Sequence, residues 1–455
     1  MTDIDQDRLN ARAKEIAYTE SRRLLDRTRG SKELYERALA SLPLGVGSSF
    51  QVGDPYPVYL REGRGSKVWD VDGNEYVDTH GGFGCMLVGH AHPKIVEAIT
   101  RAARSGTHFA APTEATVLYA EELCRRFRLD KVRFVNSGTE ATMSAIRIAR
   151  AATGRDDIVK IEGSYHGHHD QVMFSVVPNA DLMGGREQPA STPMSLGIPS
   201  FLQGHTHVVP FNDLTVLERL LAERGDDIAC LIVEPVMMNI GIAEPLPGYL
   251  QGLKDLLHRH GALLIFDEVK TGAAIAPGGA IERYGVQPDL ACFAKAIAGG
   301  TPGGAFGGRE DVMETIERGA AQQGTFNGNP LVSAAGLAAL TEVLTPEAYE
   351  HLGKLGTRLA EGCAAALREF GIPGHAVDLG AKGCVSYRPE PLRNYRDFLE
   401  ANVTVFEASY PWMVNRGVFM TPGDEEQWTL SVQHTESDVD RYVDAFASLC
   451  AELAK

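Results

Sequence analysis

An alternation of short apolar runs and helix-like stretches between residues 113 and 345 constrains the fold of this chain most strongly. Each apolar run has the length and the β-branched content of a buried strand, and a segment with helical spacing follows it. The runs are residues 131–136, 157–161, 207–211, 228–233, 262–266 and 289–293. This pattern predicts an α/β fold with a mostly parallel sheet and helices on both faces. Ligands of such sheets bind at the carboxyl ends of the strands.

The length of 455 residues predicts more than one domain, because single cores stop growing near roughly 250–300 residues. We expect residues 76–345 to form the large domain. After Thr345 the pattern changes to helices mixed with short strands, which predicts a smaller α+β domain over residues 346–455. Residues 1–75 are expected to contribute to that smaller domain.

The composition argues against several functional classes. A formal net charge of −16 disfavours nucleic acids and anionic membrane surfaces as partners. The seven cysteines are scattered and lack CxxC spacing, which indicates reduced thiols rather than disulfides or a zinc site. No stretch approaches the roughly 20 apolar residues of a membrane span, and the N-terminus lacks the apolar core of a signal peptide. We therefore expect a cytoplasmic enzyme.

A turn between a strand and a helix is the first candidate for a binding site. Ser137, Gly138 and Thr139 follow the apolar Phe134-Val135 and precede a helical stretch. The free N–H groups and the positive dipole at the start of such a helix favour a phosphate group. The same residues are also typical of an ordinary helix cap.

Two charged residues follow later strands. Asp267 ends a fully apolar strand, where a carboxylate suits a cationic nitrogen or a metal, or caps the next turn. Lys295 lies between a buried strand and a run of small residues. An apolar site favours its neutral amine, which condenses with aldehydes, whereas the alternative is a surface lysine with a buried stem.

These three features together fit pyridoxal phosphate (PLP). This cofactor needs an anion site for its phosphate, a carboxylate for its pyridine nitrogen and an amine for its aldehyde. Tyr165 offers an aromatic face for the ring, and Val269 is placed to pack on the other face. The histidines after Tyr165 lack a second ligand cluster, so we predict no metal site. The glycines at 81–84 lack the spacing of a nicotinamide-binding loop.

From about residue 30 to 450 the chain resembles the class III PLP-dependent aminotransferases of fold type I. This resemblance implies a mostly parallel sheet of the seven-stranded type in the large domain. The likeness is greatest to the glutamate-1-semialdehyde 2,1-aminomutase branch. Asp267 and Lys295 stand 28 positions apart (295 − 267), as the family pattern expects. The matching motifs, in family order, are Asn136-Ser137-Gly138-Thr139-Glu140-Ala141, Tyr165-His166-Gly167-His168, Glu234-Pro235-Val236, Asp267-Glu268-Val269, Lys295 and Gly324-Thr325-Phe326-Asn327.

The resemblance implies a role for each matching residue. Lys295 is expected to hold the cofactor as a Schiff base and to act as the general base, and Asp267 to partner the pyridine nitrogen. The implied cofactor-binding residues are Ser137, Gly138, Thr139, Tyr165, His166, Asn239, Asp267, Val269, Lys295 and Thr325. Among these, Tyr165 and Val269 cover the two ring faces, and Asn239 contacts the ring hydroxyl. Thr325 reaches the phosphate of a second subunit, so a homodimer with shared sites is expected.

The predicted substrate site departs from the aminomutases. Their arginine, which binds the substrate carboxylate after a Gly-Val-x-Ser turn, is replaced here by Gln51. An arginine grips a carboxylate with two hydrogen bonds, and glutamine does not. Glu426 matches a glutamate that the aminomutases carry. The predicted substrate-binding residues are Ser48, Phe50, Gln51, Phe83 and Glu426.

These observations predict an aminotransferase that works by a ping-pong mechanism. An amine or amino acid would donate the amino group, and a keto acid or aldehyde would accept it. The alternative is a glutamate-1-semialdehyde-type 2,1-aminomutase. A racemase, a decarboxylase and an inactive binding protein also stay open. The proline-rich segment 176–204 is expected to be a mobile loop over the site entrance.

Overall fold

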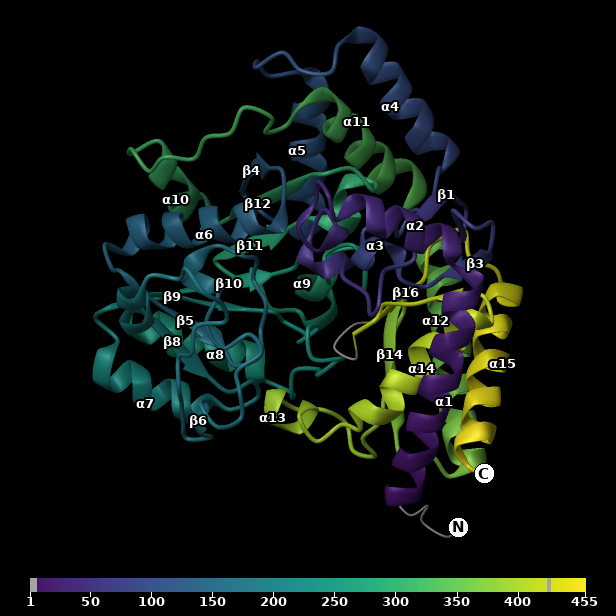
Figure 1. Cartoon of the computed structure of the whole chain (residues 1–455). Helices are drawn as coiled ribbons and strands as arrows, with labels where there is room; N and C mark the ends of the chain where they lie inside the picture. The colour runs from purple at the N-terminus through teal and green to yellow at the C-terminus, as the bar shows by residue number, and fades with distance from the viewer. Residues whose placement is uncertain (1–5, 424–426) are drawn as a thin grey trace.

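A seven-stranded sheet forms the centre of the computed structural model, which describes residues 6–423 and 427–455 (Figure 1). The strand order is β4-β12-β11-β10-β9-β5-β8. Only β12 runs antiparallel to its two neighbours within this sheet. The strands are β4 (Lys131–Val135), β5 (Asp157–Ile161), β8 (Thr206–Val209), β9 (Ile228–Val233), β10 (Leu263–Asp267), β11 (Leu290–Phe293) and β12 (Gly304–Gly308). The predicted mostly parallel sheet is confirmed.

Helices cover both faces of this sheet because its side chains alternate between two apolar layers. Ile265 packs in the layer beneath α6 (Gly138–Thr153), which crosses one face. Its neighbours Leu264 and Phe266 point to the opposite layer, with α5 (Glu114–Phe127), α7 (Leu214–Arg224) and α8 (Tyr249–Arg259). Strands buried on both faces carry continuous apolar sequences, which is why they were recognisable.

The β12 strand was not predicted from the sequence because it is rich in glycine. Glycine is a poor strand former, but here the neighbouring strands come too close for a side chain. A Cβ atom at Gly307 would meet the carbonyl oxygen of Lys131, and one at Gly308 would meet that of Asp289. The antiparallel strand therefore fits only with glycine at these positions.

Segments from both ends of the chain build the second region. Helix α1 (Gln6–Arg27) packs against α14 (Val403–Asn415), and α12 (Pro346–Phe370) packs against α15 (Glu436–Leu453) (Figure 1). One sheet beside these helices consists of β13 (His375–Leu379), β14 (Lys382–Ser386) and β16 (Trp428–Thr429). A second sheet has the strand order β1 (Leu60–Arg64), β2 (Lys67–Asp70), β3 (Glu75–Asp78) and β15 (Val418–Phe419). The β3–β15 pairing joins a segment near the start of the chain to one near its end. The domain boundaries at 75/76 and 345/346 stay a prediction.

The remaining helices connect these parts. They are α2 (Arg29–Ala38), α3 (Gly81–Gly84), α4 (Pro93–Ser105), α9 (Gly279–Tyr284), α10 (Glu310–Met313), α11 (Pro330–Ala338) and α13 (Tyr395–Phe398). Within the described ranges, none of the helices combines the length and the apolar character needed to cross a bilayer.

The segment 176–204 lies beside α7 and α13 rather than along the main cavity. It contains the short hairpin β6 (Gly184–Gly185) and β7 (Gln188–Pro189). The Gly184 carbonyl accepts a hydrogen bond from Arg396 of α13, and the Glu187 carbonyl accepts one from Arg219 of α7. No described residue of the segment lines the large cavity at the carboxyl ends of the central strands. The expected loop over the site entrance therefore finds no support in this arrangement.

Candidate active site

The carboxyl ends of β4, β5, β9, β10 and β11 surround a cavity of about 360 Å³. That volume is within the usual range for small-molecule sites. The predicted residues that line it are Ser137, Gly138, Thr139, Tyr165, His166, Asn239, Asp267, Val269, Lys295, Phe50 and Phe83. Residues spread over more than 200 positions of sequence (295 − 50 = 245) thus meet in one place.

The turn after β4 presents the start of helix α6 to this cavity. Ser137 is the N-cap, and its side chain accepts a hydrogen bond from the Glu140 N–H at 3.2 Å. A Cβ atom at Gly138 would lie 3.0 Å from both methyl carbons of Val269, so glycine permits close approach there. The N–H groups of the first helical turn have no carbonyl partner within the helix and are available to an anion.

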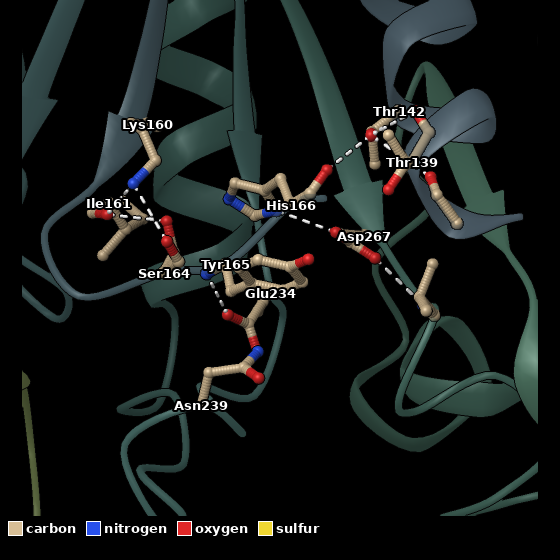
Figure 2. Close-up of polar contacts among 12 residues, drawn as sticks. Thr139, Thr142, Lys160, Ile161, Ser164, Tyr165, His166, Glu234, Asn239 and Asp267 are labelled. Carbon is tan, nitrogen blue, oxygen red and sulfur yellow. Dashed lines mark hydrogen bonds and ion pairs between the residues drawn. The ribbon is translucent and has the colours of Figure 1, made fainter. Parts of the chain in front are cut away.

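Asp267 ends β10 with its carboxylate buried at the cavity wall. His166 Nδ1 lies 2.8 Å from Asp267 Oδ2, and the Val269 N–H donates to Oδ1 at 3.0 Å (Figure 2). Thr142 holds the histidine in place by donating to the His166 carbonyl at 2.6 Å. The Nε2 atom of His166 is buried without a hydrogen-bond partner. The carboxylate is therefore fixed in orientation and shielded from water.

The loop after β5 carries Tyr165, and its backbone is tied to the loop after β9. The Tyr165 N–H donates to Glu234 Oε1 at 2.9 Å, and Asn239 Nδ2 donates to Glu234 Oε2 at 2.8 Å (Figure 2). Burial, followed by the nearby Asp267 charge, raises the pKa of the Tyr165 phenol. The ring is therefore neutral and presents an apolar face.

Lys295 begins a short 3-10 turn directly after β11, in a left-handed conformation with φ of 51°. Its Nζ donates a hydrogen bond to the Phe83 carbonyl at 2.8 Å. Phe83 also has a positive φ, of 56°. Non-glycine residues rarely adopt this conformation, and such strain gathers at functional sites. The lysine thus points into the cavity, as predicted, rather than into solvent.

Aromatic rings form the entrance. The Phe50 ring centroid lies 5.7 Å from that of Phe83 and 5.6 Å from that of Tyr165. Gln51, by contrast, turns back on its own loop, where its Oε1 accepts the Gly47 N–H at 3.1 Å. Ser48 is the N-cap of that turn, and neither Ser48 nor Gln51 lines the cavity. Glu426 lies outside the described residues.

Thr325 is exposed and does not line the cavity of its own chain. It precedes α11, in a segment where Asn136 Nδ2 donates to Asn327 Oδ1 at 2.9 Å. Its predicted contact with the phosphate of a second subunit stays a prediction.

Two charged residues that line the cavity were not among the predicted site residues. Glu234 belongs to the matching motif Glu234-Pro235-Val236 and directly follows the apolar strand β9. Lys270 Nζ donates to the Met238 carbonyl at 2.8 Å. No arginine is among the described residues that line the cavity.

These residues fit pyridoxal phosphate. The helix start offers N–H groups for a phosphate, Asp267 offers a buried carboxylate for a pyridine nitrogen, and Lys295 offers an amine. Glycine at position 138 lets the start of the helix pack closely against Val269, which lines the same cavity.

Comparisons with known proteins agree with this geometry. The family model described as "Aminotransferase class-III" matches residues 49–372. Glutamate-1-semialdehyde 2,1-aminomutase 2 of Brevibacillus brevis is 41% identical over 421 residues, which cover 91% of this chain and 96% of that protein.

Two solved structures are also similar. An ω-transaminase from Sphaerobacter thermophilus has a TM-score of 0.88 and 35% identity, covering 93% of this chain and 98% of that one. A glutamate-1-semialdehyde aminomutase variant from Pseudomonas aeruginosa PAO1, in complex with PMP, has a TM-score of 0.89 and 30% identity, covering 97% and 99%.

These relatives confirm the predicted fold type I and the cofactor. They support the aminomutase alternative better than the predicted transaminase, because the relatives named from sequence are aminomutases. The match over residues 49–372 places the chain in the class III aminotransferase family, whose cofactor is pyridoxal phosphate.

Proposed function

We propose that this protein is an aminotransferase that moves an amino group from an amine or amino acid donor to a keto acid or aldehyde in a ping-pong reaction. The observation that carries this proposal is the orientation of Gln51, whose side chain is bonded to Gly47 instead of facing the cavity. With no arginine among the described lining residues, an α-carboxylate has no bidentate partner there. A simple amine, an aromatic amine or a β-amino acid suits this entrance better.

When bound, pyridoxal phosphate supplies an aldehyde that takes up the amino group and a protonated ring that withdraws electrons from the reacting carbon. Asp267 would keep the ring nitrogen protonated, because a nearby negative charge favours the charged form. His166 keeps that carboxylate oriented through its bond of 2.8 Å. The backbone N–H groups at the helix start formed by Ser137, Gly138 and Thr139 would hold the phosphate.

Lys295 is the proposed proton carrier. Its Nζ would hold the cofactor's aldehyde carbon and would serve as the general base that carries the proton of the α-carbon. The Phe83 carbonyl, 2.8 Å from Nζ, gives the free amine a fixed position. Tyr165 and Val269 are proposed to hold the ring flat, and Asn239 to contact its hydroxyl.

A 2,1-aminomutase is the second candidate, and the named relatives at 41% identity favour it. In that reaction the amino group moves within one molecule, so no second substrate is consumed. The two candidates are separated by comparing kcat/KM for an arylalkylamine plus a keto acid with turnover of glutamate-1-semialdehyde alone. The proposal expects the first reaction to be faster. Efficient turnover of the semialdehyde alone, with no reaction of the amine, would replace it by the aminomutase.

We further propose that the working unit is a homodimer in the cytoplasm. Exposed apolar side chains gather on neighbouring segments: Phe109 after α4, Val117 and Leu118 on α5, and Phe326 before α11. Patches of this kind usually mark an interface. A second copy covering them would explain why Thr325, in the same region, is exposed in one chain. Light scattering should give twice the mass of one chain, and a monomer at micromolar concentration would contradict the proposal.

A further inference from the structure

Glu234 is a buried carboxylate whose contacts the reaction itself does not explain. It follows β9 and is 4% exposed. Three N–H groups converge on its two oxygens: Tyr165 N–H on Oε1 at 2.9 Å, and Met238 N–H and Asn239 Nδ2 on Oε2 at 2.9 and 2.8 Å. Every one of these bonds runs from a donor to the carboxylate, so Glu234 acts only as an acceptor.

These donors belong to two separate loops. Tyr165 lies in the loop after β5, whereas Met238 and Asn239 lie in the loop after β9. Tyr165 and Asn239 both line the cavity, and Glu234 lies between them (Figure 2). One carboxylate therefore connects two walls of the cofactor site.

A buried lysine secures the Tyr165 loop from its other side. Lys160 of β5 is fully buried, and its Nζ donates to the Ser164 carbonyl at 2.9 Å (Figure 2) and to the Phe174 carbonyl at 2.6 Å. Burial lowers the pKa of Lys160 to about 7, although the charges of Glu234 and Glu162 oppose this shift. Lys160 and Glu234 thus hold the residue pair Ser164-Tyr165 from opposite directions.

We propose that Glu234 is a positioning residue, which fixes the Tyr165 loop relative to the Asn239 loop before the cofactor binds. This goes beyond the proposed function and does not depend on which amine is the donor. The carboxylate does not touch substrate in this role. It acts through the two lining residues that its oxygens hold.

The geometry makes glutamine a sharp test, although glutamine has nearly the same shape. A glutamine has one acceptor oxygen and one donor NH₂ group. If the glutamine oxygen faces Met238 and Asn239, its NH₂ group faces the Tyr165 N–H. In the flipped orientation the NH₂ group faces the donors of Met238 and Asn239 instead. In either case a buried backbone N–H loses its acceptor, which is costly.

The experiment measures amide hydrogen exchange in the cofactor-free protein, together with pyridoxal phosphate affinity. In Glu234→Gln, protection of the Tyr165 or Met238 amide should fall roughly tenfold, the equivalent of about 1.4 kcal/mol. The cofactor Kd should rise by a similar factor. Glu122→Gln is the matched control, because Glu122 is also a buried carboxylate but pairs with Arg125 and Arg126 away from the cavity. It should leave both readouts unchanged.

A second variant covers the case in which Glu234→Gln does not fold. Glu234→Asp keeps the charge beside Lys160 but is one methylene shorter, so it cannot reach both loops. Selective loss of protection at one of the two amides would support the positioning role. Unchanged protection and cofactor affinity in Glu234→Asp would overturn it, leaving only a charge-balancing role. Fast exchange of the Tyr165 and Met238 amides in the unaltered protein would also overturn it.

Discussion

Replacing Asp267 by asparagine tests the carboxylate at the centre of the site. The side chain keeps its shape, so its Oδ1 still accepts the Val269 N–H, which lies at 3.0 Å in the unaltered protein. The new NH₂ group faces His166 Nδ1, which becomes an acceptor if the histidine proton moves to Nε2. We therefore expect the Asp267→Asn protein to fold and to bind the cofactor.

The expected loss lies in the proton-transfer step. Asp267 is 5% exposed, so water does not replace its charge. A nearby opposite charge shifts a pKa by roughly 1–3 units, and each unit is about 1.36 kcal/mol. Without the carboxylate the ring nitrogen loses its proton more easily, and the rate should fall roughly 10- to 1000-fold.

Stopped-flow loss of the cofactor's visible absorbance after amine addition measures this step directly. Asp289→Asn is the matched control, since Asp289 is a fully buried carboxylate at the start of β11 that pairs with Arg309. The Asp289→Asn substitution should lower the free energy of unfolding without slowing the reaction of the folded enzyme. A rate within threefold of the unaltered protein in Asp267→Asn would refute the reasoning.

Further substitutions test other parts of the account. Lys295→Ala should abolish turnover while leaving the melting temperature near normal, and substantial residual transamination would remove Lys295 from the mechanism. Phe50→Ala should raise KM for an arylalkylamine roughly 2- to 12-fold, from the loss of an aromatic contact of about 0.5–1.5 kcal/mol, but should leave KM for a small aliphatic amine unchanged. Burial raises the pKa of Asp157, but hydrogen bonds from His207 and His205 outweigh it and lower the pKa overall. The stability that Asp157 contributes is present above its unfolded pKa of about 3.9 and is lost as the pH falls through the lower folded pKa. Urea titrations should therefore show that acid lowers the free energy of unfolding less in Asp157→Asn than in the unaltered protein.

The central sheet and the cofactor residues were predictable because their signals are local. Strands buried on both faces carry continuous apolar runs, and a strand followed by Ser137-Gly138-Thr139 carries the signature of a helix start. Asp267 and Lys295 were recognisable as charged residues at the carboxyl ends of such strands. Topology then brought them together, because parallel strands end at one edge.

The parts that escaped prediction depend on contacts between distant segments. No strand was predicted around Gly307, and only the close approach of the Lys131 carbonyl explains why glycine occupies a strand there. The Phe83 carbonyl is a backbone group, and its contact with Lys295 has no sequence signal. Gln51 was expected at the substrate, but a backbone N–H four residues earlier in the sequence holds its side chain. A single sequence does not show whether a side chain forms its hydrogen bond within its own loop or with a distant segment.

The most direct test of the account is the visible spectrum of the purified protein with pyridoxal phosphate, recorded before and after addition of an amine that has no carboxylate. The account predicts a yellow protein whose colour bleaches on addition of the amine and returns on addition of a keto acid, with neither change in Lys295→Ala. A yellow protein that does not respond to any such amine, but turns over glutamate-1-semialdehyde without a second substrate, would contradict the proposed aminotransferase and favour the aminomutase.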